Sequence, residues 1–286
     1  AMKVRLASEN FGCFIDDFDA AAATSDDIRT CRDLLFHHGV LFLENQNWSV
    51  DDHVRIARLF GSIVINRYFA AVAGRPEVAT VITEPGQGWV IGEKWHTDHS
   101  YDRAPAMGSI LYAVETPPHG GDTCFATMQA AFDALDPALR VRLERLSARH
   151  ESRHVFAPSE AQRAAAAEAR GEGGITEHAR EYPEAVHPIV VRHPETGRKG
   201  LFVNPEFTTS IVGMAKQESD RLLAELFDHI LQPQFLYRFK WRPGSVAIWD
   251  NRSTWHRAMN DYQGYRRHMH RITISGTSLA GDTVAA

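Results

Sequence analysis

Apolar and polar positions follow one another along the chain in a pattern that predicts a mainly β protein with helices concentrated near its start. Two early helices are expected, because Ser25 and Ser49 each precede acidic residues and then apolar residues at helical spacing. Gly61 ends the second of these patterns. The expected helices cover residues 25–37 and 49–60, two short stretches within 128–146, and 219–231.

Short apolar runs between Gly, Pro and Asn turns predict the strands. They cover residues 39–43, 62–65, 78–83, 109–114, 186–191, 201–203, 235–241, 245–249 and 267–274. Many short strands with early helices favour a jelly-roll-like core with flanking helices. Because no internal repeat and no clear linker interrupts the pattern, we expect a single domain over residues 1–286.

One internal segment, residues 157–185, departs from this pattern because it is rich in alanine and glycine. Segments of this length without clear elements are usually functional loops or disordered ones. We therefore expect an insertion within the domain, which could act as a lid over a site.

Composition narrows the class of protein. With 44% hydrophobic and 23% charged residues among 286, the chain is expected to bury an ordinary globular core. The net charge of −5 shows no basic excess, so no nucleic-acid partner is expected. No apolar run reaches about 18 residues, so no membrane partner is expected either. Three cysteines without metal-site spacing favour a reducing, cytoplasmic location.

The 15 histidines are an unusual count and prompt a search for metal ligands. If residues 95–100 form a strand, His96 and Asp98 point to one face and His99 to the other. A histidine and a carboxylate on one face supply two ligands of the 2-His-1-carboxylate triad that marks non-haem Fe(II) oxygenases. His256, 158 residues beyond Asp98, is the candidate third ligand, since a jelly roll brings distant strands together.

Two arginines follow on the last expected strand. Arg267 and Arg271 share a face, whereas His268 and His270 lie on the opposite one. Two buried guanidinium groups are costly unless anions meet them. The planar fork of arginine matches a carboxylate with two hydrogen bonds. The pair therefore indicates a dicarboxylate cosubstrate and an anionic substrate.

Taken together, these motifs resemble the taurine dioxygenase family of Fe(II)/2-oxoglutarate-dependent oxygenases, which includes the aryloxyalkanoate herbicide dioxygenases. The resemblance runs from about Gly39 to Gly276. The segments that carry it are Trp95-His-Thr-Asp98, Gly120-Gly-Asp-Thr123, His193-Pro-Glu-Thr-Gly197, Phe202-Val-Asn-Pro-Glu-Phe-Thr-Thr209, Trp249-Asp-Asn-Arg252, His256 and Arg267.

The resemblance implies a 2-oxoglutarate-dependent non-haem iron dioxygenase with a double-stranded β-helix, the jelly roll of cupin-like proteins. It implies Fe(II) as cofactor and 2-oxoglutarate and O₂ as cosubstrates, with succinate and CO₂ released. It further implies the roles of individual residues: the iron ligands and catalytic centre are His96, Asp98 and His256; Thr123 and Arg267 bind the distal carboxylate of 2-oxoglutarate; and Arg271 lies near the substrate anion or the metal-side carboxylate of the cosubstrate.

Departures from the taurine enzymes at the expected substrate positions favour another small organic acid. Asn66 and Phe69 stand where taurine dioxygenase carries polar His and Tyr side chains, and Gly92 stands where it carries an Asn. A more apolar or aromatic acid is expected, bound by a wall that includes Tyr68, Tyr101, Phe207 and Trp249. Hydroxylation would lead to C–O or C–S cleavage wherever the hydroxylated carbon bears a heteroatom. Relatives often form homodimers or homotetramers, so a homo-oligomer is expected.

Three alternatives compete with this interpretation. The same oxygenase chemistry could serve a biosynthetic hydroxylase or desaturase that acts on an amino-acid-derived metabolite. A zinc hydrolase could use the same three ligands with a bound water, although Arg267 would then have no role. A non-catalytic metal-binding jelly roll would be favoured by a blocked pocket.

Overall fold

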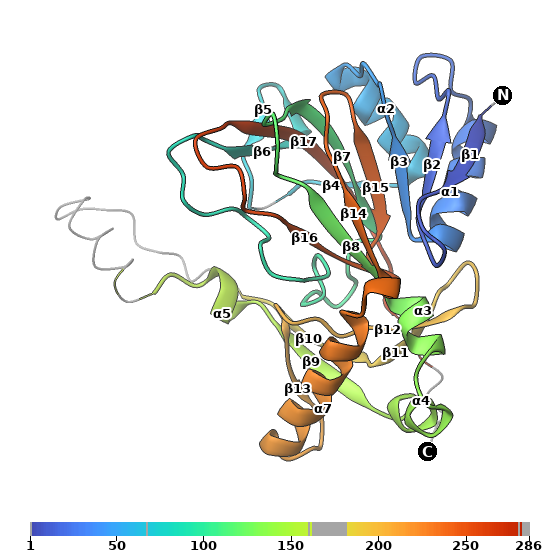
Figure 1. The fold of residues 1–286 in the computed structure, drawn as a ribbon, viewed down its shortest axis with the longest axis vertical. Helices are drawn as coiled ribbons and strands as arrows, with labels where there is room; N and C mark the ends of the chain where they lie inside the picture. The colour runs from blue at the N-terminus through green and yellow to red at the C-terminus, as the bar shows by residue number, and fades with distance from the viewer. Residues whose placement is uncertain (1, 67, 160, 162–181, 280, 282–286) are drawn as a thin grey trace.

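The computed structural model describes residues 2–66, 68–159, 161, 182–279 and 281, and within them the chain is mainly β with flanking helices (Figure 1). The largest sheet has nine strands, all antiparallel to their neighbours except for the parallel pair β2–β3. Its order is β1 (Lys3–Leu6), β2 (Cys13–Asp16), β3 (Val40–Leu43), β15 (Val246–Asp250), β7 (Gly108–Glu115), β17 (Arg267–Ile274), β6 (Arg75–Thr83) and β5 (Ala71–Val72), with β4 (Ile63–Val64) paired to β17.

A smaller antiparallel sheet packs against this one. Its order is β14 (Leu236–Phe239), β8 (Thr123–Thr127) and β16 (Thr254–Ala258). The two sheets meet through buried aromatic side chains. The ring of Phe42 stacks on Phe239 at 4.2 Å between centroids and meets Phe125 at 5.6 Å. Since strands far apart in sequence contribute to this layer, the chain can bring distant polar residues to one end of it.

Helices α1 (Ser25–His38) and α2 (Val50–Phe60) cover the other face of the large sheet (Figure 1). Both begin with a reciprocal capping box: Thr24 with Asp27, and Ser49 with Asp52. The sequence prediction of Ser25 as the first N-cap is therefore wrong by one residue. Thr24 takes that position because its hydroxyl accepts the Asp27 N–H while the Asp27 carboxylate accepts the Thr24 N–H.

The remaining elements form a third region beside the two sheets (Figure 1). A cluster of buried apolar side chains from these elements forms its core. The elements are the sheet of β10 (Glu184–Pro188), β9 (Ser147–Glu151) and β13 (Thr208–Ile211), the pair β11 (Val190–Arg192) and β12 (Lys199–Leu201), and the helices α3 (Met128–Asp133), α4 (Pro137–Leu143), α5 (Arg153–Phe156), α7 (Lys216–Ile230) and the 3₁₀ helix η1 (Pro233–Phe235).

Most expected elements are present, with three differences. The expected strand over 186–191 is split into β10 and β11. Several observed elements were not predicted: β1, β2, β5, β8, β9, β13, α5 and β16, which carries His256. Residues 95–100 are not a strand: only His96 forms an isolated bridge, and the chain then turns through His99 at φ +58°. Of the expected insertion, residues 160 and 162–181 lie outside the described residues, and β10 already begins at Glu184.

Among the described residues, no helix combines the length and apolar character that crossing a membrane requires.

Two buried histidines make stability depend on pH. Burial lowers the pKa of His53 to about 3 and that of His150 to about 3. Between those values and the ordinary 6.5, the unfolded chain binds protons that the folded chain does not. The free energy of unfolding should therefore fall as pH drops below about 6.5, by up to about 1.4 kcal/mol per pH unit for each histidine. Urea unfolding at about pH 7 and about pH 5 measures this, and His53→Gln should flatten the dependence; an equally steep dependence in that variant would contradict it.

Candidate active site

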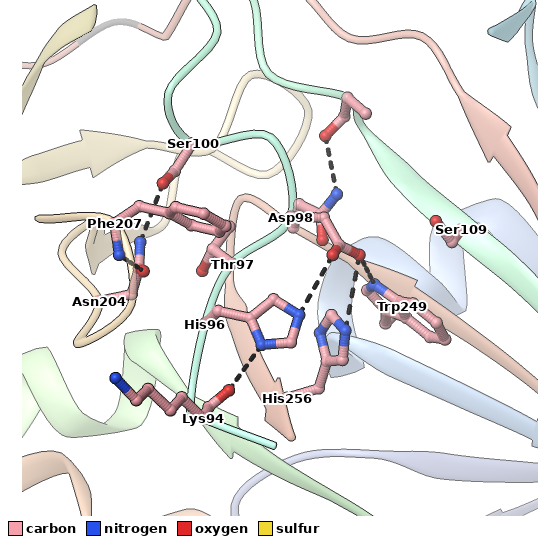
Figure 2. A network of polar contacts seen from close by, with 12 residues as sticks. Lys94, His96, Thr97, Asp98, Ser100, Ser109, Asn204, Phe207, Trp249 and His256 are labelled. Atoms are coloured by element: carbon pink, nitrogen blue, oxygen red, sulfur yellow. Dashed lines mark hydrogen bonds and ion pairs between the residues drawn. The ribbon is translucent and has the colours of Figure 1, made fainter. Parts of the chain in front are cut away.

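Three side chains from two distant parts of the chain meet beside the two sheets. His96 comes from the isolated bridge, Asp98 from the turn after it, and His256 from β16. The backbone positions both histidines, because His96 N–H donates to His256 O at 3.1 Å and His256 N–H donates to His96 O at 3.0 Å. One donor atom of each residue lies within 4.8 Å of the others. Although the expected strand is absent, His96 and Asp98 still face the same side (Figure 2).

The donor atoms of this cluster suit a cation held between the three groups. Nδ1 of His96 donates to the Lys94 carbonyl at 2.7 Å, so the lone pair of a neutral ring lies on Nε2, 3.3 Å from Asp98 Oδ1. Burial lowers the pKa of His256 to about 3, which keeps that ring neutral. Burial disfavours a charged His96 too, but the Asp98 carboxylate outweighs it and raises the pKa of His96. Two imidazole nitrogens and one oxygen of a buried carboxylate, Asp98 Oδ1, form a donor set that fits a divalent metal ion.

The second oxygen of Asp98 is held by two further residues. Arg271 Nη2 donates to Oδ2 at 2.6 Å and Trp249 Nε1 donates to it at 3.3 Å. Burial would raise the pKa of Asp98, yet Arg271 and the adjacent imidazoles hold it well below its ordinary value. Arg271 Nε also donates to Ser109 Oγ at 3.2 Å. The remaining N–H groups of this guanidinium are left for another acceptor.

The indole of Trp249 should orient the Asp98 carboxylate. Replacing Trp249 by Phe keeps a ring beside His256, whose centroid lies 4.6 Å away, but removes the Nε1 donor. Loss of such an outer contact typically costs about 10–100-fold in metal affinity. We expect Fe(II) binding by Trp249→Phe to weaken about tenfold in anaerobic calorimetry. Trp48→Phe, which loses an indole hydrogen bond to Gln46 away from the cavity, is the matched control; equal affinities in both variants would contradict this role.

Arg267 is a buried cation that no carboxylate in the described part of the chain pairs with. Its Nε donates to the Gly121 carbonyl at 3.2 Å, and burial lowers its pKa to about 10. Thr123 lines the same cavity, and its Oγ1 accepts a hydrogen bond from Trp241 Nε1 at 2.8 Å. A buried guanidinium without an anion is costly, so this end of the cavity suits a carboxylate.

A cavity of about 500 Å³ connects these groups, and every site residue expected from the sequence lines it. Gly92 shows why a glycine stands there, since its φ is +81° and a Cβ would lie 3.1 Å from Cε1 of His96. The shared lining residues are His96, Asp98, His256, Thr123, Arg267, Arg271, Asn66, Tyr68, Phe69, Gly92, Tyr101, Phe207 and Trp249.

Sequence reasoning missed other lining residues. His99 was expected on the opposite face, but the turn brings it to the cavity, where its Nδ1 lies 3.3 Å from Asp102. Glu206 directly precedes Phe207 in a quoted motif, so that motif could have pointed to it. Nothing in the sequence marked the remaining missed lining residues, which come from separate strands, loops and α5: Val81, Trp89, Ile91, Leu111, Val155, Phe156 and Ala258.

One wall of the cavity is aromatic. Phe156 of α5 stacks on Tyr68 at 4.5 Å and meets Phe207 at 6.0 Å between centroids. Tyr101 meets Phe207 at 4.8 Å, and Phe207 lies edge-on to His96 at 6.3 Å. Figure 2 shows the Phe207 ring beside His96. A flat, apolar group beside the metal site would be well accommodated.

Comparisons with known proteins agree with this geometry. The chain matches the model of the "Taurine catabolism dioxygenase TauD, TfdA family" over residues 7–273. It is 34% identical to an alpha-ketoglutarate-dependent dioxygenase, cnsM, of Penicillium expansum, over 84% of this chain and 68% of that protein. It is 32% identical to the alpha-ketoglutarate-dependent 2,4-dichlorophenoxyacetate dioxygenase of Cupriavidus pinatubonensis, over 92% of this chain and 94% of that protein.

Among solved structures, a taurine dioxygenase from Burkholderia xenovorans superposes with a TM-score of 0.81 at 31% identity, covering 98% of this chain and 91% of that one. The family match spans the smaller sheet, the large sheet except β1 and the last residue of β17, and all three side chains of the His–Asp–His cluster. The relatives share a requirement for alpha-ketoglutarate, which is 2-oxoglutarate, and the cluster has the donor set of an Fe(II) site. The chain is therefore a member of the TauD/TfdA family and a dioxygenase that depends on Fe(II), 2-oxoglutarate and O₂.

Proposed function

We propose that this enzyme hydroxylates a small organic acid that is more apolar or aromatic than taurine. The observation that carries the proposal is the aromatic wall beside the His–Asp–His cluster. Phe69 cannot supply the polar contact that the taurine enzymes have at this place, and Asn66 uses its Oδ1 to accept the backbone N–H groups of Tyr68 and Phe69. The residues that line the cavity therefore suit a substrate whose main part is apolar and which carries one acidic group at its end.

In this proposal His96, Asp98 and His256 hold the iron. Their convergence within 4.8 Å and their donor set of two imidazole nitrogens and one carboxylate both support it. With 2-oxoglutarate and O₂, the iron supplies the oxidising power that attacks a C–H bond. The protein holds the ligand atoms in place and lines the surrounding cavity with apolar side chains.

Thr123 and Arg267 would bind the distal carboxylate of 2-oxoglutarate. Support comes from the buried charge of Arg267, which pairs with no carboxylate of the described residues, and from the Thr123 hydroxyl on the same cavity. Arg271 would bind the acidic group of the substrate or the other carboxylate of the cosubstrate, using the N–H groups that Asp98 and Ser109 leave free.

One observation favours a second candidate, a biosynthetic hydroxylase or desaturase of an amino-acid-derived metabolite. Phe156 extends the aromatic wall from α5, immediately before the expected insertion at 157–185, and a cover rich in aromatic contacts suits such a substrate. A cavity of about 500 Å³ is not the blocked pocket that would favour a non-catalytic role, and Arg267 remains unexplained in a zinc hydrolase.

Turnover assays with matched substrates test the proposal. We expect the enzyme to turn over arylalkanoic and aryloxyalkanoic acids, measured by succinate release, with a higher kcat/KM than taurine, because their rings pack against the aromatic wall of the cavity. Each assay monitors substrate consumption together with succinate, so that uncoupled 2-oxoglutarate decay is recognised. Taurine outperforming every aromatic acid would overturn the proposed substrate class.

Several broader expectations stay proposals. The two packed sheets support a double-stranded β-helix, and the family match over 7–273 supports a single domain. The three thiols are free, which supports a reducing, cytoplasmic location. A homodimer or homotetramer is proposed from the family resemblance, and gel filtration with light scattering would measure it.

A further inference from the structure

Glu206 is the feature of the cavity that the proposed function leaves without a role. It lies in the turn between β12 and β13 and lines the same cavity as the metal site. Apart from Asp98, it is the only carboxylate among the described lining residues. Its Oε2 is buried from solvent and accepts no hydrogen bond from the described part of the chain. An acceptor of this kind calls for a donor that the protein itself does not supply.

The turn holds Glu206 in a fixed place. Its backbone carbonyl accepts a hydrogen bond from His154 Nε2 at 2.6 Å. The N–H of the next residue, Phe207, donates to Asn204 Oδ1 at 2.9 Å, as Figure 2 shows, and the Phe207 carbonyl accepts the Glu151 N–H at 2.9 Å. The backbone that carries Glu206 is therefore tied on both sides of this residue.

The chemistry around this carboxylate favours a cation. An ionised carboxylate accepts hydrogen bonds and donates none, and a charged donor satisfies it better than a neutral one. The cavity also presents the rings of Phe207, Tyr101 and Phe156, and aromatic faces attract ammonium groups. A protonated amine meets both requirements, whereas a second acidic group would be repelled.

We propose that Glu206 binds a protonated amine of the substrate, so that the substrate is a zwitterion: an apolar or aromatic acid that also carries an amino group. The inference rests on the proposed function, because it assigns the acidic end of the same molecule to Arg271. Both residues line one cavity, so opposite charges at two places fix the direction in which the substrate enters. An acid without the amine leaves Glu206 unpaired, which gives strong discrimination.

The test uses pairs of acids that differ only by the amine: phenylalanine with 3-phenylpropionate, and taurine with ethanesulfonate. Binding to the enzyme loaded with Fe(II) and 2-oxoglutarate is measured by calorimetry without O₂, and turnover is measured by succinate release with O₂. We expect the wild type to bind the amine-bearing member of the preferred pair at least about tenfold more tightly. Glu206→Gln should remove this preference and leave Fe(II) affinity unchanged.

Glu225→Gln is the matched control, since it makes the same change of charge on the exposed face of α7 and should behave as the wild type. Equal binding of both members by the wild type, or an unchanged preference in Glu206→Gln, would overturn the inference while the proposed function stands if aromatic acids are oxidised. A loss of Fe(II) affinity that weakens both members alike would also overturn it, because Glu206 would then act through His96.

The two proposals can fail separately. If the taurine pair is preferred over every aromatic pair and that preference disappears in Glu206→Gln, the amine assignment stands and the aromatic substrate class fails. If the aromatic pair is preferred but the amine makes no difference, the aromatic substrate class stands and the amine assignment fails.

Discussion

Asp98→Ala should abolish turnover, with a loss of more than about 100-fold, beyond the roughly 10–100-fold cost of losing only an outer contact of a metal site. The substitution removes the one anionic donor of the cluster and leaves two neutral imidazoles. It also leaves the Arg271 guanidinium without its 2.6 Å partner, so a positive charge would then face the metal ion directly. Succinate release and anaerobic Fe(II) calorimetry should both show the loss.

Asp98→Glu should fail as well, because the longer side chain moves the carboxylate away from the positions that Trp249 and Arg271 define. Asp228→Ala on the exposed face of α7 serves as the control for removing a carboxylate, and thermal unfolding shows whether each variant is folded. A folded Asp98→Ala enzyme that retained wild-type Fe(II) affinity would show that this carboxylate is not a ligand.

The second large effect is expected at Arg267. Arg267→Ala should raise the KM for 2-oxoglutarate by at least about tenfold, and by up to about 100-fold, because a bidentate, charge-assisted contact in a buried place is lost. The KM for the organic substrate should change little. Arg267→Lys should recover part of the loss, since it restores the charge without the fork.

Steady-state kinetics with each substrate varied in turn separates these effects. The Arg267 side chain also contacts the Gly121 carbonyl, so thermal unfolding should accompany the assay. A changed KM for the organic substrate together with an unaltered KM for 2-oxoglutarate would show that Arg267 binds the substrate instead.

Much of the site could be predicted because its residues lie in short motifs whose spacing is itself chemical. His96 and Asp98 are two residues apart, a spacing that places both side chains on one face of extended backbone, and they face the same side in the structure although the chain turns at Asp98. Arg267 and Arg271 share a face of β17 as predicted and line the same cavity, although Ile272 on the opposite face is buried too. The helices could also be predicted from the sequence, since Ser49 and Gly61 mark the two ends of α2.

The rest depends on tertiary contacts that leave no local pattern. The left-handed turn at His99 is set by the bridge between His96 and His256 and by contacts of the next residue, Ser100. The strand alternation that predicted His99 on the face opposite His96 is therefore wrong at this residue. Phe156 reaches the cavity only because α5 packs beside the turn that carries Phe207. Glu206 could be found as a motif neighbour, but its unpaired oxygen becomes visible only once the cavity is assembled.

The most direct test of the central claim is an anaerobic titration of the protein with Fe(II) in the presence of 2-oxoglutarate, followed by visible absorption. If His96, Asp98 and His256 hold one iron with 2-oxoglutarate beside it, a weak metal-to-ligand charge-transfer band should grow to saturation at one Fe(II) per chain and should be lost in His256→Ala. A wild-type protein that binds Fe(II) and 2-oxoglutarate without such a band, or a His256→Ala protein that keeps it, would contradict the account.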